Sequence, residues 1–210
     1  LENNRQERKS RGNVGICGTG FSALDRRIGG LRPGQLIVVG GRTSMGKTAF
    51  AVSLVLNVCK TQRIPTAIFS LEMPQIDIGT RIVAGEADVS ASSAFNGELE
   101  QRDMEAVSFA QDRLAGMPLI TDKSAGMTDG KLIARCDELV RKYGVKIFVL
   151  DYLQQVGSSE RGASREQQVA AVSRACKEIA MEHNVCFIAL AQLNREVEKQ
   201  LGDKMPELHH

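Results

Sequence analysis

The segment that most constrains this chain is GRTSMGKT, which runs from Gly41 to Thr48. It matches the pattern G-x-x-x-x-G-K-[ST] at every fixed position, and that pattern is typical of a loop that binds nucleotide phosphates. An apolar run, LIVVG at 36–40, precedes the segment, and a helix-forming run follows it. Since such a loop joins a buried strand to a helix, the segment predicts an α/β fold.

The spacing within the loop has a physical reason. Gly41 and Gly46 allow a tight turn, so that backbone N–H groups point at phosphate oxygens. The helix that starts near Lys47 directs the positive end of its dipole at the same oxygens. Lys47 is expected to reach the β- and γ-phosphates of ATP, and the Thr48 hydroxyl to bind Mg²⁺. The residues predicted to contact the nucleotide are Gly41, Ser44, Met45, Gly46, Lys47, Thr48 and Ala49.

Short apolar runs alternate with helical patterns along the rest of the chain. The runs are LIVVG (36–40), TAIFS (66–70), PLITD (118–122), KIFVLD (146–151) and VCFIALAQ (185–192). Each is continuously apolar, which is typical of parallel strands that are buried on both faces. We therefore expect a mostly parallel sheet of at least five strands, with helices on both faces and ligands at the carboxyl ends of the strands.

Capping residues mark two helix starts. Thr128 is expected to cap one helix, and Ser164 with Gln167 forms a capping box for another. Residues 85–97 are small and polar, and they are predicted to form a loop.

Composition excludes some classes of protein and leaves others open. The formal net charge of +2 is too small to argue for or against nucleic-acid binding. None of the five cysteines lies in a close CxxC pair, so neither a zinc site nor a disulfide framework is indicated, and a reducing cytoplasm is the simplest location. No apolar stretch approaches the roughly 20 residues that span a bilayer, so no membrane association is expected.

Three polar residues follow predicted strands and are candidates for chemistry at the phosphate loop. Asp151 closes the run IFVLD and is expected to contact Mg²⁺ directly or through water, unless it merely starts a turn. Glu72 could orient and partly deprotonate the attacking water, or it could pair with a helix dipole. Gln192 could donate to the γ-phosphate or the attacking water, or it could satisfy local backbone groups.

Taken in order, these motifs resemble the C-terminal ATPase domain of the DnaB-type replicative helicases, a branch of the RecA-like P-loop NTPases. The stretches that carry the resemblance are TGFSALDRRIGGLRPGQLIVVGGRTSMGKT, FSLEMP, FVLDYLQ and ALAQLNREVE. The resemblance implies that Glu72 is the catalytic glutamate, that Asp151 is the Mg²⁺ carboxylate and that Gln192 senses the γ-phosphate. Thr43 stands where family members often carry proline, a change expected to leave the phosphate contacts intact.

The resemblance also implies a domain organisation and partners. The first residues of the chain are polar and basic, so residues 1–14 are expected to be a linker or flexible lead-in. The resemblance implies that residues 15–210 are a RecA-like ATPase domain. That domain is expected to be incomplete at its C-terminus, because family members carry an arginine finger beyond the third motif. The cofactors would be ATP and Mg²⁺. The partners would be single-stranded DNA, a homo-hexameric ring, a primase and a helicase loader, in a bacterial cytoplasm or encoded by a phage or plasmid.

Two segments are predicted to contact DNA, because loops after the fourth and fifth strands line the channel of related hexamers. They span 155–166 and 194–207, and both lack aromatic residues, which favours contacts with the DNA backbone. The alternative is a pair of solvated loops with ordinary charges. The basic residues concerned are Arg161, Arg165, Arg195, Lys199 and Lys204.

Two other functions stay open at this point. The first is a RecA-like recombinase or repair ATPase, against which the SLEM and DYLQ motifs argue. The second is a nucleotide-binding assembly module with little catalysis. The isolated chain is expected to bind Mg-ATP and to hydrolyse it slowly.

Overall fold

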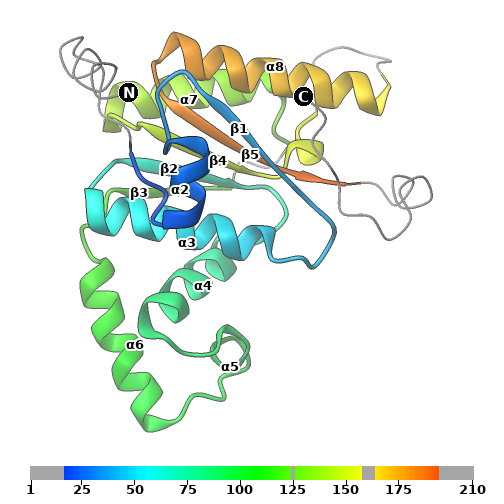
Figure 1. The fold of residues 1–210 in the computed structure, drawn as a ribbon. Helices are drawn as coiled ribbons and strands as arrows, with labels where there is room; N and C mark the ends of the chain where they lie inside the picture. Colours follow the sequence, from blue (N-terminus) through cyan, green and yellow to red (C-terminus); the bar gives the residue numbers. More distant parts are fainter. Residues whose placement is uncertain (1–16, 124–125, 158–163, 194–210) are drawn as a thin grey trace, which may run out of the picture.

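The computed structural model describes residues 17–123, 126–157 and 164–193. Within them, five strands form one sheet in the order β1-β5-β4-β2-β3, and all neighbouring strands are parallel. The predicted parallel sheet is therefore confirmed (Figure 1). The strands are β1 (Leu36–Gly41), β2 (Thr66–Ser70), β3 (Leu119–Asp122), β4 (Ile147–Asp151) and β5 (Cys186–Gln192).

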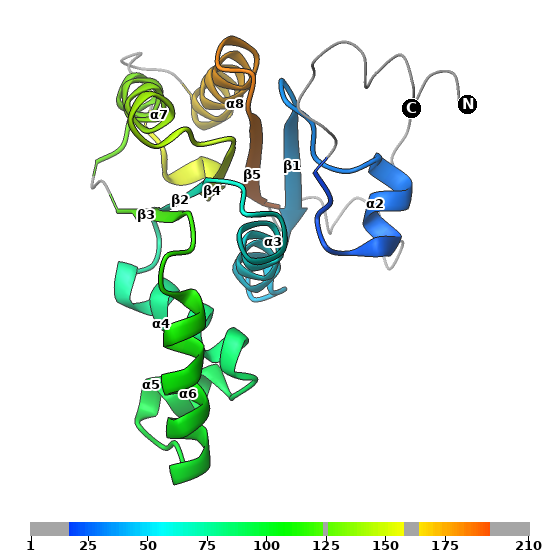
Figure 2. The same cartoon turned by 90° about the vertical axis from the view of Figure 1, so that its left-hand side faces the viewer.

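Helices cover both faces of this sheet, as the sequence predicts. On one face lie α3 (Lys47–Gln62) and α4 (Gln75–Ala87), and on the other lie α7 (Asp129–Tyr143) and α8 (Arg165–Glu182) (Figure 2). The remaining helices are α2 (Ser22–Ile28), α5 (Ala91–Asn96), α6 (Gln101–Leu114) and the 3₁₀ turn η1 (Leu153–Gln155). Helices α5 and α6 extend away from the sheet (Figure 2). No helix in the described parts is long and apolar enough to cross a membrane.

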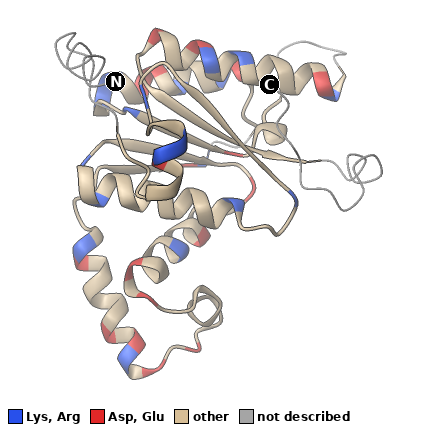
Figure 3. Ribbon diagram, in the orientation of Figure 1, with Lys and Arg blue, Asp and Glu red and all other residues tan. Residues whose placement is uncertain are grey.

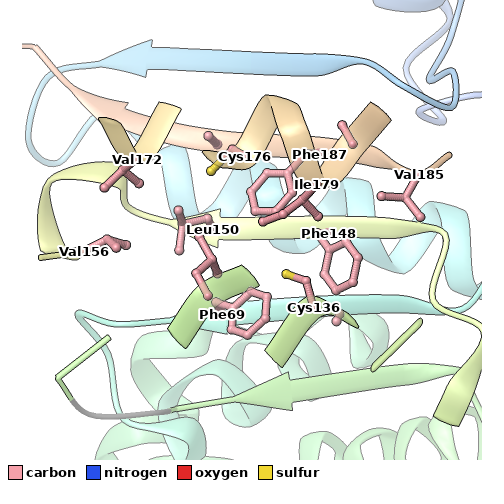
Figure 4. Close-up of a cluster of buried hydrophobic side chains, with 14 of the residues drawn as sticks. Phe69, Cys136, Phe148, Leu150, Val156, Val172, Cys176, Ile179, Val185 and Phe187 are labelled. Carbon is pink, nitrogen blue, oxygen red and sulfur yellow. The ribbon is translucent and has the colours of Figure 1, made fainter. Parts of the chain in front are cut away.

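The core beneath α7 and α8 is built around three phenylalanines. Phe69, Phe148 and Phe187 come from β2, β4 and β5, and their rings stack with centroid separations of 6.0 and 5.8 Å (Figure 4). All three are fully buried. Phe148 and Phe187 are register partners on β4 and β5, and Phe69 lies diagonally across from Phe148, two residues beyond its register partner Ala67. The three rings therefore form one row across the sheet, with Phe148 in the middle.

The opposite face of the same strands packs against α3 and α4. Ile68, Val149 and Ile188 alternate with the phenylalanines along their strands and are buried against α3 residues such as Val55. Burial on both faces explains why the sequences of the central strands read as continuous apolar runs. β1 departs from this pattern, since it lies at the edge of the sheet and Val38 is 51% exposed.

The predicted caps are confirmed, and the predicted loop at 85–97 is largely wrong. Thr128 accepts a hydrogen bond from the Lys131 amide, and Ser164 forms the capping box with Gln167. Between 85 and 97, α4 continues to Ala87 and α5 covers Ala91–Asn96. The Ser90 side chain caps α5 by accepting from the Ser93 amide. Capping and packing against α4 stabilise a short helix that helix propensity alone does not predict.

Charged residues lie mainly on the helices, and the strands nearly lack them (Figure 3). One charged cluster ties three helices together. The Glu86 side chain on α4 is 6% exposed and pairs with Lys60 on α3 at 2.8 Å and with Arg113 on α6 at 2.6 Å. Burial acts to raise the pKa of Glu86, but hydrogen bonds and charges from its two partners outweigh burial and lower it.

We expect Glu86→Gln to lower the free energy of unfolding at neutral pH by about 1 to 2 kcal/mol, because both cations lose their carboxylate. A carboxyl group whose pKa is lower in the folded protein stabilises the fold above its ordinary pKa and ceases to do so as the pH falls through the folded value. The difference between variant and wild type should therefore shrink in acid. Urea titrations from pH 7 to pH 3 measure it, with the exposed Glu105→Gln as control. A pH-independent difference would contradict this account.

Candidate functional site

The phosphate loop lies where the sequence predicts it, between the end of β1 and the start of α3. Two of its residues, Ser44 with φ 62° and Gly46 with φ 79°, adopt left-handed backbone conformations. Gly46 is the N-cap of α3, and no side-chain hydrogen bond caps that helix. The first N–H groups of α3 therefore remain available for an anion that approaches along the helix axis.

Lys47 folds back over this loop. Its Nζ donates to the carbonyl oxygens of Gly41 at 2.9 Å and Arg42 at 2.7 Å. A Cβ on residue 41 would lie 3.1 Å from Lys47 Cγ, so glycine at this position leaves room for the lysine stem. The ammonium group is thus held beside the loop, where phosphate oxygens could replace the two carbonyl contacts.

Asp151 reaches the loop from β4. Its Oδ2 accepts a hydrogen bond of 2.7 Å from Thr48 Oγ1, and the residue is only 2% exposed. Burial raises the pKa of Asp151, while the Thr48 hydrogen bond and the charges of Lys47 and Arg81 partly offset that rise. A hydroxyl and a carboxylate are hard oxygen donors, and Mg²⁺ commonly takes one or two carboxylates besides phosphate oxygens. The pair therefore fits a magnesium site.

Gln192 lies beside the loop because β5 pairs with β1. Gly41 and Gln192 are register partners, and Gln192 Nε2 donates to Thr43 Oγ1 at 2.8 Å. The side chain thus contacts a loop hydroxyl instead of the local backbone groups that the alternative interpretation required. Its role toward the γ-phosphate stays a prediction.

Glu72 follows β2, whose last residue Ser70 is the register partner of Asp151. The Glu72 side chain is exposed and lines a cavity of about 300 Å³. It precedes Pro74, the N-cap of α4, and Asp77 is the acidic residue in the first turn of that helix. Glu72 is therefore outside α4, which weakens the helix-dipole alternative. The geometry leaves its catalytic role a prediction.

Sequence reasoning missed Arg81. Its positive charge acts to lower the pKa of Asp151. Its Nε is buried without a hydrogen-bond partner, and its guanidinium lies 5.7 Å from the centre of the Phe95 ring. Nothing in the pattern of α4 distinguishes Arg81 from a solvated arginine, because only the packing of α4 beside α3 brings it close to the site.

The predicted DNA contacts are scarcely covered by the described residues. Arg165 is the exposed first residue of α8. The other four, Arg161, Arg195, Lys199 and Lys204, lie outside the described residues, as do residues 1–14.

The family described as "DnaB-like helicase C terminal domain" matches residues 15–210. The chain is 38% identical over 190 residues to the replicative DNA helicase DnaB of Leifsonia xyli subsp. xyli, covering 90% of this chain and 41% of that protein. It is 35% identical over 206 residues to the replicative DNA helicase DnaC of Bacillus subtilis, covering 98% and 45%. The chain thus spans less than half the length of these curated relatives.

The fold of the chain is also similar to those of solved helicase structures. The structure described as "ATPase Domain of G40P" superposes with a TM-score of 0.85 at 28% identity, covering 98% of this chain and 73% of that one. A DnaB-like replicative helicase, described with its interactions with primase, gives a TM-score of 0.85 at 28% identity, covering 98% and 49%. The RecA-like fold that the sequence predicts is thereby confirmed.

Proposed function

Because the chain belongs to the DnaB-like helicase C terminal domain family, we propose that it is the ATP-driven motor of a ring-shaped replicative DNA helicase. The observation that carries this proposal is the 2.7 Å contact between Thr48 and Asp151. It brings the end of the phosphate loop together with a buried carboxylate, as the binding of a magnesium nucleotide requires. The relatives described above are named replicative helicases, which favours this function over a recombinase.

The residues of the site would divide the work of ATP hydrolysis. The loop N–H groups and Lys47 bind the triphosphate, and Thr48 with Asp151 holds Mg²⁺, which neutralises phosphate charge when bound. Glu72 accepts a proton from the water that attacks the γ-phosphorus, while the bond to the β-phosphate oxygen breaks. Gln192 donates to the γ-phosphate. Arg81 adds positive charge that acts on Asp151.

The partners of this motor follow from the family. We propose that the chain acts in a homo-hexamer with nucleotide at the subunit interfaces, in a bacterial cytoplasm. Single-stranded DNA would pass along the segments that contain Arg161, Arg165, Arg195, Lys199 and Lys204. Primase and a helicase loader are the further proposed partners, and a solved relative is described with its interactions with primase.

The test of this function is ATP turnover measured against protein concentration, with and without single-stranded DNA. At low concentration the chain should bind Mg-ATP and turn it over slowly. The rate per subunit should rise as subunits assemble and rise again when DNA is added, because assembly completes each interfacial site. Rapid turnover that depends on neither concentration nor DNA would overturn the motor function. Failure to bind Mg-ATP would overturn the nucleotide site itself.

A further inference from the structure

Gln192 forms hydrogen bonds through its main-chain N–H, its carbonyl oxygen and its side-chain amide. Its main-chain N–H donates to Gln154 Oε1 at 3.2 Å, and its carbonyl oxygen accepts from Gln154 Nε2 at 2.9 Å. One amide side chain therefore satisfies both main-chain groups of Gln192. Gln154 belongs to η1, which follows β4, so this clamp joins the carboxyl ends of β4 and β5.

The side chain of Gln192 has a third contact, on the phosphate loop. Its Nε2 donates to Thr43 Oγ1 at 2.8 Å. Thr43 is exposed and reaches this amide through its hydroxyl, so a residue without a side-chain acceptor would lose the contact. The chain of contacts from Thr43 through Gln192 to Gln154 therefore links the ends of β1, β5 and β4 at the edge of the sheet where the site lies.

These contacts have different consequences. The two-bond clamp acts on the main chain of Gln192, so it fixes where the residue stands and leaves the side chain free to change partner. The bond to Thr43 uses one of the two N–H donors of Nε2 and holds the amide against the loop hydroxyl. A γ-phosphate that draws this amide away from the loop must break the bond to the Thr43 hydroxyl, and each net hydrogen bond of this kind is worth about fivefold in affinity.

We propose that Gln154 is a positioning residue for Gln192 and that the Thr43 hydroxyl is the resting partner of the Gln192 amide, displaced by the γ-phosphate of ATP. The part that concerns Gln154 depends only on hydrogen bonds within the chain. The part that concerns Thr43 rests on the proposed function. If both parts hold, Gln154 and Thr43 contribute to the preference of the site for a triphosphate over a diphosphate, although neither residue needs to contact the nucleotide.

The first measurement is amide hydrogen exchange by NMR without nucleotide. Gln154→Met removes both clamp bonds and should speed exchange of the Gln192 amide by about fivefold or more. Gln62→Met is the matched control, because Gln62 makes the same reciprocal pair of bonds to the main chain of Gly18, at 3.2 and 2.8 Å. It should speed exchange at Gly18 and leave Gln192 unchanged. Unaltered exchange at Gln192 in Gln154→Met would overturn the positioning role.

A conservative variant covers the case in which Gln154→Met does not fold. Gln154→Glu keeps an acceptor for the Gln192 amide and loses the donor to its carbonyl oxygen. In this variant the Gln192 amide should therefore exchange about as slowly as in wild type, although the second bond of the clamp is lost. Exchange of the Gln192 amide that is about fivefold or more faster than in wild type would contradict the assignment of the two bonds.

The second measurement is calorimetric affinity for ADP and for the non-hydrolysable analogue AMP-PNP, both with Mg²⁺. Gln154→Met should reduce the preference for AMP-PNP over ADP by about fivefold, and Thr43→Val should raise AMP-PNP affinity by about fivefold. ADP affinity should hardly change, and Thr43→Ser should behave as wild type. Equal affinities in Thr43→Val and wild type would overturn the resting-partner role. A wild-type chain that binds neither nucleotide would overturn that role and the proposed function together, while the exchange measurement still decides the role of Gln154.

Discussion

Replacing Lys47 by alanine is expected to lower the rate of ATP hydrolysis by at least about 100-fold and to weaken Mg-ATP binding. The loop amides are dipoles, whereas Lys47 brings a full positive charge to a position that the Gly41 and Arg42 carbonyl oxygens already define. Removing that charge leaves the developing negative charge on the phosphates without its main protein counter-charge. Steady-state phosphate release and calorimetry on the same preparation measure both effects.

A matched control exists for this substitution. Lys131 on α7 also donates from Nζ to a main-chain carbonyl oxygen, that of Gly126 at 3.0 Å. Lys131→Ala removes the same side-chain chemistry outside the phosphate loop and should leave hydrolysis near the wild-type rate. If Lys47→Ala and Lys131→Ala hydrolysed ATP equally well, the phosphate loop could not be the catalytic site.

The largest expected effect on stability is that of Phe148→Ala, which should lower the free energy of unfolding by about 3 to 5 kcal/mol. Phe148 is fully buried in β4, and its ring contacts those of Phe69 and Phe187 on the neighbouring strands. Truncation removes the middle ring of that row, and the strands on either side are held in register and cannot close the cavity. Urea denaturation followed by circular dichroism measures the change.

Phe109→Ala provides the comparison, because that ring lies on α6 and is 65% exposed. Phe109→Ala should lower the free energy of unfolding by no more than about 0.5 kcal/mol. If Phe148→Ala proves too unstable to purify, Phe148→Leu should cost about 1 to 1.5 kcal/mol and serves the same purpose. If Phe148→Ala and Phe109→Ala lowered the free energy of unfolding equally, the row of phenylalanine rings would not be what stabilises the sheet.

Much of the fold was predictable from local sequence. The strands read as apolar runs because the central ones are buried on both faces, and the caps at Thr128 and Ser164 depend on residues three positions away. The phosphate loop is equally local, since its shape depends on consecutive residues. Asp151 and Gln192 could be placed near it because the carboxyl ends of parallel strands meet at one edge.

Other features required the tertiary structure. Helix α5 forms where small polar residues predicted a loop, because capping by Ser90 and packing on α4 stabilise it. Val38 is exposed because β1 lies at the edge of the sheet, and the amino-acid composition of β1 does not reveal that position. The sequence likewise gave no reason to separate Arg81 from other arginines, or to connect Thr43 and Gln154 with Gln192.

The sequence by itself therefore determined the parallel sheet, the phosphate loop and the sheet edge at which ligands meet, since each is indicated by patterns of residues that are near neighbours in the chain. Only the tertiary structure decided which side chains complete that edge. Those contacts join residues as far apart as Thr43 and Gln192, whose residue numbers differ by 149. No local pattern encodes them, because they depend on how helices and strands pack once the chain has folded.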